Sequence, residues 1–101
     1  MRTSQTARTT AVRARGAILQ DNPIAKAVRH LEAGQWQAAH ALVQKDSTEL
    51  GCWAHGIVHL IEGDLENAKY WYRRAHRPLP HGNTAAAEIS ALKASVKRDA
   101  Q

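Results

Sequence analysis

Hydrophobic residues recur every three to four positions along most of the chain, which is the spacing of an amphipathic helix. The first clear segment begins at Asn22-Pro23, where Asn22 suits an N-cap and Pro23 the first helical position. Its apolar stripe consists of Ile24, Ala27, Val28 and Leu31. Gly34 is placed as the C′ residue that ends this first helix.

Two further helices are predicted before residue 63. The second runs from about Gln35 to Lys45, and the third from about Thr48 to Glu62. Asp46 and Glu49 have the spacing of a capping box, so we expect Asp46 to cap the third helix. The inward positions are Trp36, Ala39, Leu42 and Val43 in the second helix and Leu50, Trp53, Ala54, Ile57, Leu60 and Ile61 in the third.

The last two predicted helices are separated by a proline-rich stop. Gly63 closes the third helix, and Asp64 caps a fourth that runs to about Arg77. Pro78 and Pro80 end it, since proline has no backbone N–H for the helix. A fifth helix runs from residue 83 or 84 to about Lys97. The sequence therefore predicts an all-α fold of five helices joined by tight turns.

The first four helices repeat one pattern. A shift of 29 residues places apolar positions on apolar positions and one turn glycine on the other. The matched pairs are His30-Leu31 with His59-Leu60, Gly34 with Gly63, Trp36 with Leu65, Ala39 with Ala68, and Leu42-Val43 with Trp71-Tyr72. We therefore expect two short antiparallel hairpins of about 29 residues and one C-terminal helix.

The second unit carries a motif. Its small, turn, aromatic and proline positions are Gly56, Gly63-Asp64, Ala68, Tyr72, Ala75 and Pro80. With these spacings, residues 23–80 resemble tetratricopeptide repeats, and the run 71–75 is similar to the end of a Sel1-like unit. The segment 55–75 also resembles a motif, HGxxHxxEGDxxNAxYWYRRA, of small proteins whose function is unassigned. The resemblance implies a helical-repeat fold that binds a protein or peptide, although the repeats are shorter than the usual length of about 34 residues.

Charge divides the chain into two parts. Residues 1–20 contain four arginines and no acidic residue, whereas the other ten basic residues face nine acidic ones. Most of the net charge of +5 therefore belongs to the N-terminal segment. We expect 1–20 to be basic and partly disordered, with a short helix over 10–20, and 21–98 to form a single domain.

The composition limits the environment and the chemistry. Cys52 is the only cysteine, so the chain has neither an internal disulfide nor a cysteine-based zinc cage. This favours a reducing compartment, and we expect the protein to be cytoplasmic. No apolar run approaches the roughly 20 residues of a membrane span.

Three potential metal ligands share one face of the third predicted helix. His55, His59 and Glu62 fall within about 60° of one another, nearly opposite the apolar arc. A histidine pair at i and i+4 with a nearby carboxylate can bind zinc or another divalent ion. Such pairs also arise by chance, and structural histidines bonded to a neighbouring helix explain the same residues.

Tyr70 points away from the buried arc of the fourth helix, beside Arg73 and Arg74. Exposed tyrosine and arginine are typical of hot spots in protein interfaces. The alternative is that Tyr70 packs on the N-terminal helix.

These patterns favour a non-enzymatic interaction module that binds a protein or peptide through His55, His59, Glu62 and Tyr70. Catalysis is disfavoured because no nucleophile–base pair, phosphate loop or cofactor motif can be assembled. One alternative is a divalent-metal protein that uses His55, His59 and Glu62. Another is non-specific binding of nucleic acid or acidic surfaces through the arginine-rich N-terminus, although no nucleic-acid-binding fold is recognised. Barely covered apolar edges also suggest a homodimer.

Overall fold

The computed structural model describes residues 22–82 and 84–100 and contains five helices. They are α2 (Pro23–Glu32), α3 (Trp36–Val43), α4 (Glu49–Glu62), α5 (Leu65–Arg74) and α6 (Ala85–Ala100). Strands are absent from these residues, so the predicted all-α fold is confirmed. The expectations for segment 1–20, including its short helix, lie outside the described residues.

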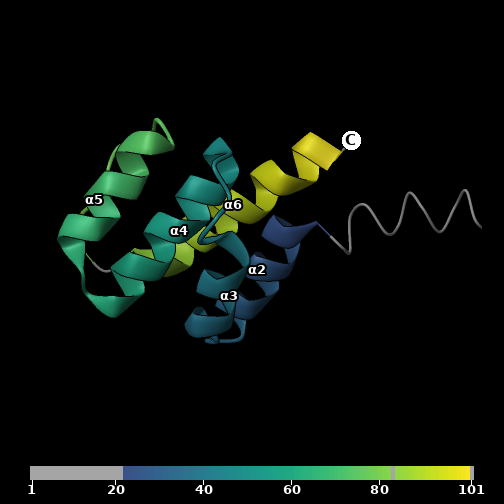
Figure 1. The fold of residues 1–101 in the computed structure, drawn as a ribbon, viewed down its shortest axis with the longest axis horizontal. Coiled ribbons are helices and arrows are strands. Elements are labelled where there is room, and N and C mark those ends of the chain that lie inside the picture. Colours follow the sequence, from purple (N-terminus) through teal and green to yellow (C-terminus); the bar gives the residue numbers. More distant parts are fainter. Residues whose placement is uncertain (1–21, 83, 101) are drawn as a thin grey trace, which may run out of the picture.

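Helix α4 occupies the centre of the fold. It packs against α2, α3, α5 and α6, and Figure 1 shows it between α5 on one side and α2 and α3 on the other. Nine consecutive residues of α4, 51–59, are buried. The sequence places His55 and His59 nearly opposite the apolar arc of this helix, yet both are buried, because His40 of α3 and Trp71 of α5 pack against His55. Each described helix also lacks the length and hydrophobicity needed to cross a membrane.

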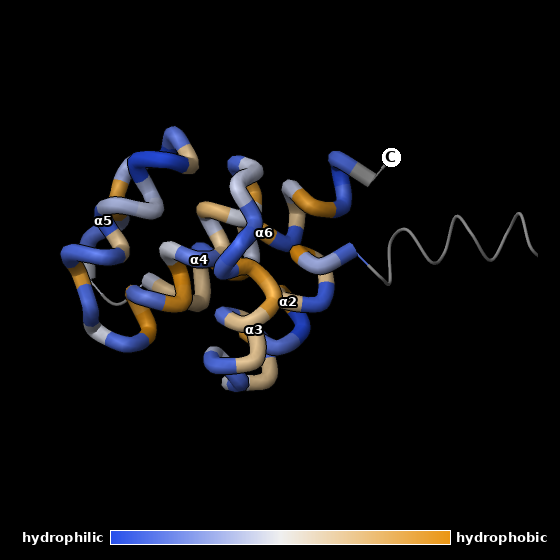
Figure 2. Tube along the Cα trace, in the orientation of Figure 1, coloured by the Kyte–Doolittle hydropathy of each residue, from blue (hydrophilic) through white to orange (hydrophobic). Residues whose placement is uncertain are grey.

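The core fills the space between α4 and its neighbours. In Figure 2 the hydrophobic positions gather where the helices meet, whereas α5 is mostly hydrophilic. The largest fully buried side chains are Trp53, Tyr72, Ile57, Leu92, Val43, Val58 and Cys52. Trp36 and Trp71 are only partly buried, although both were expected to belong to the core.

A half-buried carboxylate joins three helices. Glu88 of α6 accepts hydrogen bonds on Oε1 from Trp53 Nε1 of α4 at 2.9 Å and from the Tyr72 hydroxyl of α5 at 2.7 Å. Burial and the neighbouring carboxylate raise the pKa of Tyr72. This contact fixes the positions of α5 and α6 relative to α4. It also links α5 to α6, since the backbone of α5 packs against α4 alone.

The two predicted turn glycines adopt the same geometry. Gly34 and Gly63 have φ of +77° and +82°, in the left-handed region that glycine enters without a Cβ penalty. After each glycine, a backbone hydrogen bond that spans six residues closes the helix. The N–H of Gln35 donates to His30 O at 2.7 Å, and the N–H of Asp64 donates to His59 O at 2.9 Å. The 29-residue spacing therefore coincides with two equivalent helical turns.

Helix α5 ends earlier than predicted. Its last residue is Arg74 rather than Arg77, because His76 adopts a φ of +58°. The N–H of Arg77 donates to Tyr72 O and that of His76 to Arg73 O, both at 3.0 Å. This is the same closing motif as at the glycines, with a histidine in the left-handed position.

Two further expectations about helix ends are wrong, one for α4 and one for α6. Thr48 rather than Asp46 caps α4, with its hydroxyl accepting from Gly51 N at 3.0 Å. Asp46 instead accepts from the N–H of Thr48 at 2.9 Å and thereby orients the cap. Helix α6 begins at Ala85 and extends to Ala100, past the predicted end at Lys97.

Candidate functional site

Three histidine rings meet between α3 and α4. His40 projects from α3, and His55 and His59 come from successive turns of α4. One nitrogen of each ring lies within 4.8 Å of a nitrogen of the other two. The centroid of the His40 ring lies 4.7 Å from that of His55 and 5.5 Å from that of His59. Both pairs of rings meet edge to face. We call His40, His55 and His59 the histidine cluster.

His55 is the most buried member of the histidine cluster. It is 4% exposed, and its Nδ1 is buried with no hydrogen-bond partner. Its ring stacks on Trp71 of α5, with centroids 3.9 Å apart, and on His59 at 5.0 Å. Burial, followed by the charges of His40 and His59, lowers the pKa of His55 to about 4. The ring is therefore neutral at pH 7 and has one nitrogen lone pair free.

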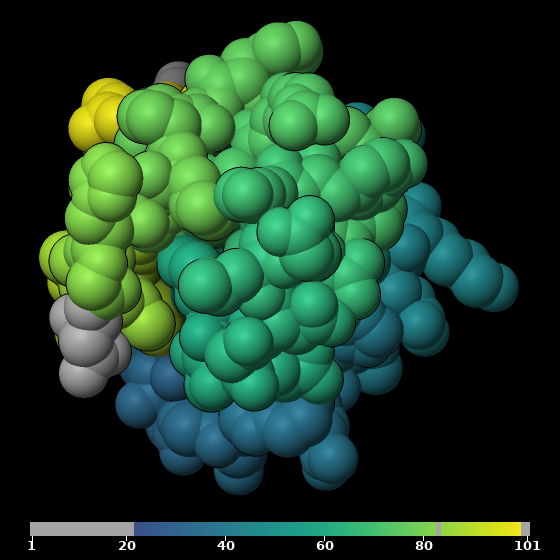
Figure 3. Space-filling view, turned by 90° about the vertical axis from the view of Figure 1, so that its left-hand side faces the viewer, coloured from purple at the N-terminus to yellow at the C-terminus, as the bar shows by residue number. Residues whose placement is uncertain are grey.

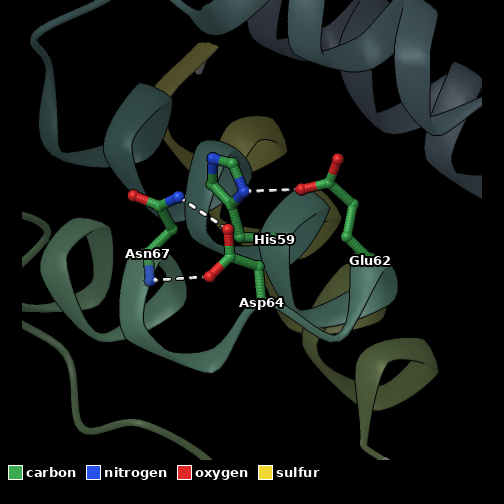
Figure 4. Close-up of polar contacts among 4 residues, drawn as sticks. All are labelled: His59, Glu62, Asp64 and Asn67. Carbon is green, nitrogen blue, oxygen red and sulfur yellow. Dashed lines mark hydrogen bonds and ion pairs between the residues drawn. The ribbon is translucent and has the colours of Figure 1, made fainter.

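Glu62 orients His59 rather than completing a ligand set with His55. The Nδ1 of His59 lies 2.7 Å from Glu62 Oε1, as Figure 4 shows. His59 is 9% exposed, whereas Glu62 is exposed at the end of α4. When Nδ1–H donates to this carboxylate, Nε2 is the ring nitrogen of His59 that is left to act as a ligand. The expected set of His55, His59 and Glu62 is thus replaced by two groups that share His59.

The second group consists of His59, Glu62 and Asp64. Asp64 already serves as the N-cap of α5: its carboxylate accepts from Asn67 N at 3.3 Å and from Asn67 Nδ2 at 2.7 Å (Figure 4). These two bonds lower the pKa of Asp64. The predicted role of Asp64 as the cap of α5 is confirmed.

The outer face of α5 carries the other predicted site residues. Tyr70 is 48% exposed, and the Arg74 guanidinium lies 5.6 Å from its ring centroid and 5.7 Å from that of Trp71. Arg73 is exposed on the same helix. We call Tyr70, Arg73 and Arg74 the α5 surface; Figure 3 views the molecule from this side, and α5 covers the middle of the face.

The remaining described histidines lie elsewhere. His30 Nδ1 is 2.7 Å from Gln35 Oε1, and His76 Nδ1 is 2.7 Å from Glu49 Oε2. His30 and His59 occupy equivalent positions in the 29-residue pattern, but His30 bonds to a turn residue and His59 to its own helix. No common interhelical contact therefore explains this pair.

His40 is the member of the histidine cluster that the sequence patterns did not single out, although a signal is present. His40 follows Trp36 by four positions and precedes Val43 by three, so it lies beside the apolar stripe that packs α3 on α4. No protein-family model matches the chain, and neither a curated protein nor a solved structure matches it.

Proposed function

We propose that the protein is a non-enzymatic helical module, with two tetratricopeptide-like or Sel1-like hairpins, that binds an acidic peptide segment of a partner protein through the α5 surface. The observation that carries the proposal is the half-exposed ring of Tyr70 held by Arg74. Tyrosine and arginine are the residues that most often dominate binding energy in interfaces. The equivalent turns at Gly34 and Gly63 support the repeat architecture.

Charge supports an acidic partner. Within the described residues, Arg73, Arg74 and Arg77 form neither ion pairs nor hydrogen bonds through their guanidinium groups. The acidic residue of α5 and its acidic N-cap have other partners, Glu66 with Lys69 at 3.4 Å and Asp64 with Asn67. An acidic peptide would therefore meet unpaired positive charge beside an aromatic ring, which favours both encounter rate and specificity.

The position of α5 also supports the proposal. This helix packs its backbone on α4 alone, so its outer face lies at the end of the helix stack. Burying the Tyr70 ring against a partner would remove apolar surface from water without rearranging the core. The buried, unbridged Cys52 fits a reducing compartment, and we propose the cytoplasm.

Binding of a fluorescent glutamate-rich peptide, measured by anisotropy at moderate salt, tests the proposal. Tyr70→Ala should weaken binding about 10-fold or more, as loss of a hot-spot side chain does. Arg73→Gln/Arg74→Gln should weaken it similarly, whereas Lys97→Gln/Arg98→Gln removes the same charge from exposed positions on α6 and should change it little. Equal losses in both charge variants would show a non-specific charge effect and refute the α5 surface.

A single-stranded oligonucleotide serves as the second probe in the same assay. Preference for the oligonucleotide over the peptide would contradict a protein partner and favour nucleic-acid binding. The homodimer stays a prediction, and light scattering at micromolar concentration measures its mass.

A further inference from the structure

We propose that His40, His55 and His59 form a binding site for one divalent transition-metal ion of the zinc class, with ring nitrogens as ligands. The site is separate from the α5 surface and does not depend on it. Its three donors come from both hairpins, His40 from the first and His55 and His59 from the second. Folding brings them within 4.8 Å of one another, although 15 residues separate His40 from His55 in the sequence.

The unpartnered nitrogen of His55 is the observation that points to a ligand. A buried polar atom without a hydrogen bond destabilises the fold, so most such atoms have partners. His55 Nδ1 has none among the described residues, while the ring is held in place by Trp71 on one face and His59 on the other. Coordination of a cation by the His55 ring would use a lone pair that the protein leaves free.

Glu62 supplies the orientation that a metal-binding histidine needs. In metal centres the nitrogen that does not bind the metal usually donates its N–H to a carboxylate or carbonyl. The 2.7 Å contact from His59 Nδ1 to Glu62 provides this arrangement and leaves Nε2 for the ion. Glu62 is therefore a positioning residue of the site rather than a ligand.

The donor set selects the type of metal. Three imidazole nitrogens suit zinc, cobalt, nickel or copper, whereas calcium and magnesium prefer oxygen ligands. Zinc–nitrogen bonds of about 2.0–2.1 Å place tetrahedral donors about 3.3 Å apart, so no pair of these nitrogens has to close by more than about 1.5 Å. His40 can provide this movement because it is only half-buried, whereas His55 is locked by stacking.

The overlapping group of His59, Glu62 and Asp64 is the weaker candidate. Both carboxylate oxygens of Asp64 are engaged in capping α5, and Glu62 is bonded to His59. A metal there would compete with the cap and with the His59–Glu62 bond. The two candidates are distinguished by Asp64→Asn, which preserves capping ability but removes a charged ligand.

Calorimetric titration of untagged, chelator-treated protein with Zn²⁺ tests the site. We expect one ion per chain, with affinity reduced roughly 100-fold or more in His40→Ala and in His55→Phe, beyond the roughly 10- to 100-fold expected for Glu62→Gln. His55→Phe keeps a ring on Trp71. His40→Ala lies at a half-buried position and leaves no hole in the core, so at least one ligand variant should fold.

The matched control removes three histidines outside the cluster, His30→Gln/His76→Gln/His81→Gln, and should leave zinc affinity unchanged. Quenching of Trp71 fluorescence by Cu²⁺ gives a second readout. Trp71→Phe should remove this quenching, and His55→Phe should weaken it. Absence of zinc binding, binding unaffected by His40→Ala and His55→Phe, or loss confined to the control variant would overturn the proposal. A large loss in Asp64→Asn would move the ion to the second group and would also overturn it.

Discussion

The ring of His55 lies flat on the ring of Trp71, with centroids 3.9 Å apart and planes inclined by 12°. This contact joins α4 to α5 through a polar side chain. Because Trp71 covers one face of the ring and His59 the other, His55 is removed from water without gaining a hydrogen bond at Nδ1. A position that looks polar in the sequence is therefore part of the packed interior.

Acid should destabilise the metal-free protein through His55. Its folded pKa of about 4 lies below the ordinary value of 6.5, so the folded state disfavours the charged ring. The stability contributed by neutral His55 is present above pH 6.5 and is lost as the pH falls toward 4, by at most about 3 kcal/mol. Like-charged neighbours, His40 from α3 and His59 from α4, act in the same direction.

Urea unfolding in the presence of chelator between pH 7.5 and 4.5 measures this effect. His55→Phe keeps the stacking and removes the titrating group, so its unfolding free energy should depend less on pH. The same pH slope in both proteins would place the acid sensitivity in other residues.

Gly56→Ala should destabilise the packing of α4 against α5. A Cβ at Gly56 would lie 2.5 Å from Cδ1 of Tyr72 and 2.8 Å from Cε1, and this ring is 1% exposed and cannot move aside. We expect a loss of about 1–3 kcal/mol from overpacking, which exceeds the gain of up to about 1 kcal/mol from helix propensity. A double-mutant cycle with Tyr72→Leu checks the mechanism, since the cost of the alanine should shrink when the ring is absent.

His76→Gly should stabilise the protein. His76 is the one described non-glycine residue with positive φ, at +58°, where a Cβ costs about 1–2 kcal/mol and glycine costs little. The lost contact with Glu49 joins two exposed side chains, so it contributes about 0–1 kcal/mol. Thermal unfolding should show a higher Tm for His76→Gly, and Glu49→Gln isolates the ion pair. A lower Tm in both variants by equal amounts would show that the ion pair outweighs the backbone strain.

Alkali should destabilise the fold through Tyr72. Burial, with the hydrogen bond to Glu88, raises the pKa of Tyr72 above the unfolded value of 10. The stability from the neutral hydroxyl is therefore present below pH 10 and declines as the pH rises above it. Tyr72→Phe removes the 2.7 Å bond and should cost about 1 kcal/mol at pH 7, with a shallower decline above pH 10 in urea unfolding. A steeper decline in the variant would contradict this assignment.

Much of the fold could be predicted because its signals are local. Asn22 accepts from Ile24 N at 2.8 Å, and Gly34 and Gly63 take the left-handed turns that their spacing indicated. Of the two alternatives for Tyr70, the exposed ring that the helical wheel indicates agrees with its 48% exposure. The end of α5 could not be placed, because His76 is not a residue type that marks a left-handed turn.

The sequence by itself determined the five helices, the caps at Asn22 and Asp64 and the left-handed turns at Gly34 and Gly63, since these depend on residues within a few positions of one another. Only the tertiary structure decided what surrounds α4. The packing of α3 and α5 on opposite flanks of that helix brought His40 to His55 and His59 and placed Trp71 against His55. A helical wheel shows which residues share a face but not whether another helix covers it, and that cover determines both the burial of His55 and its chemistry.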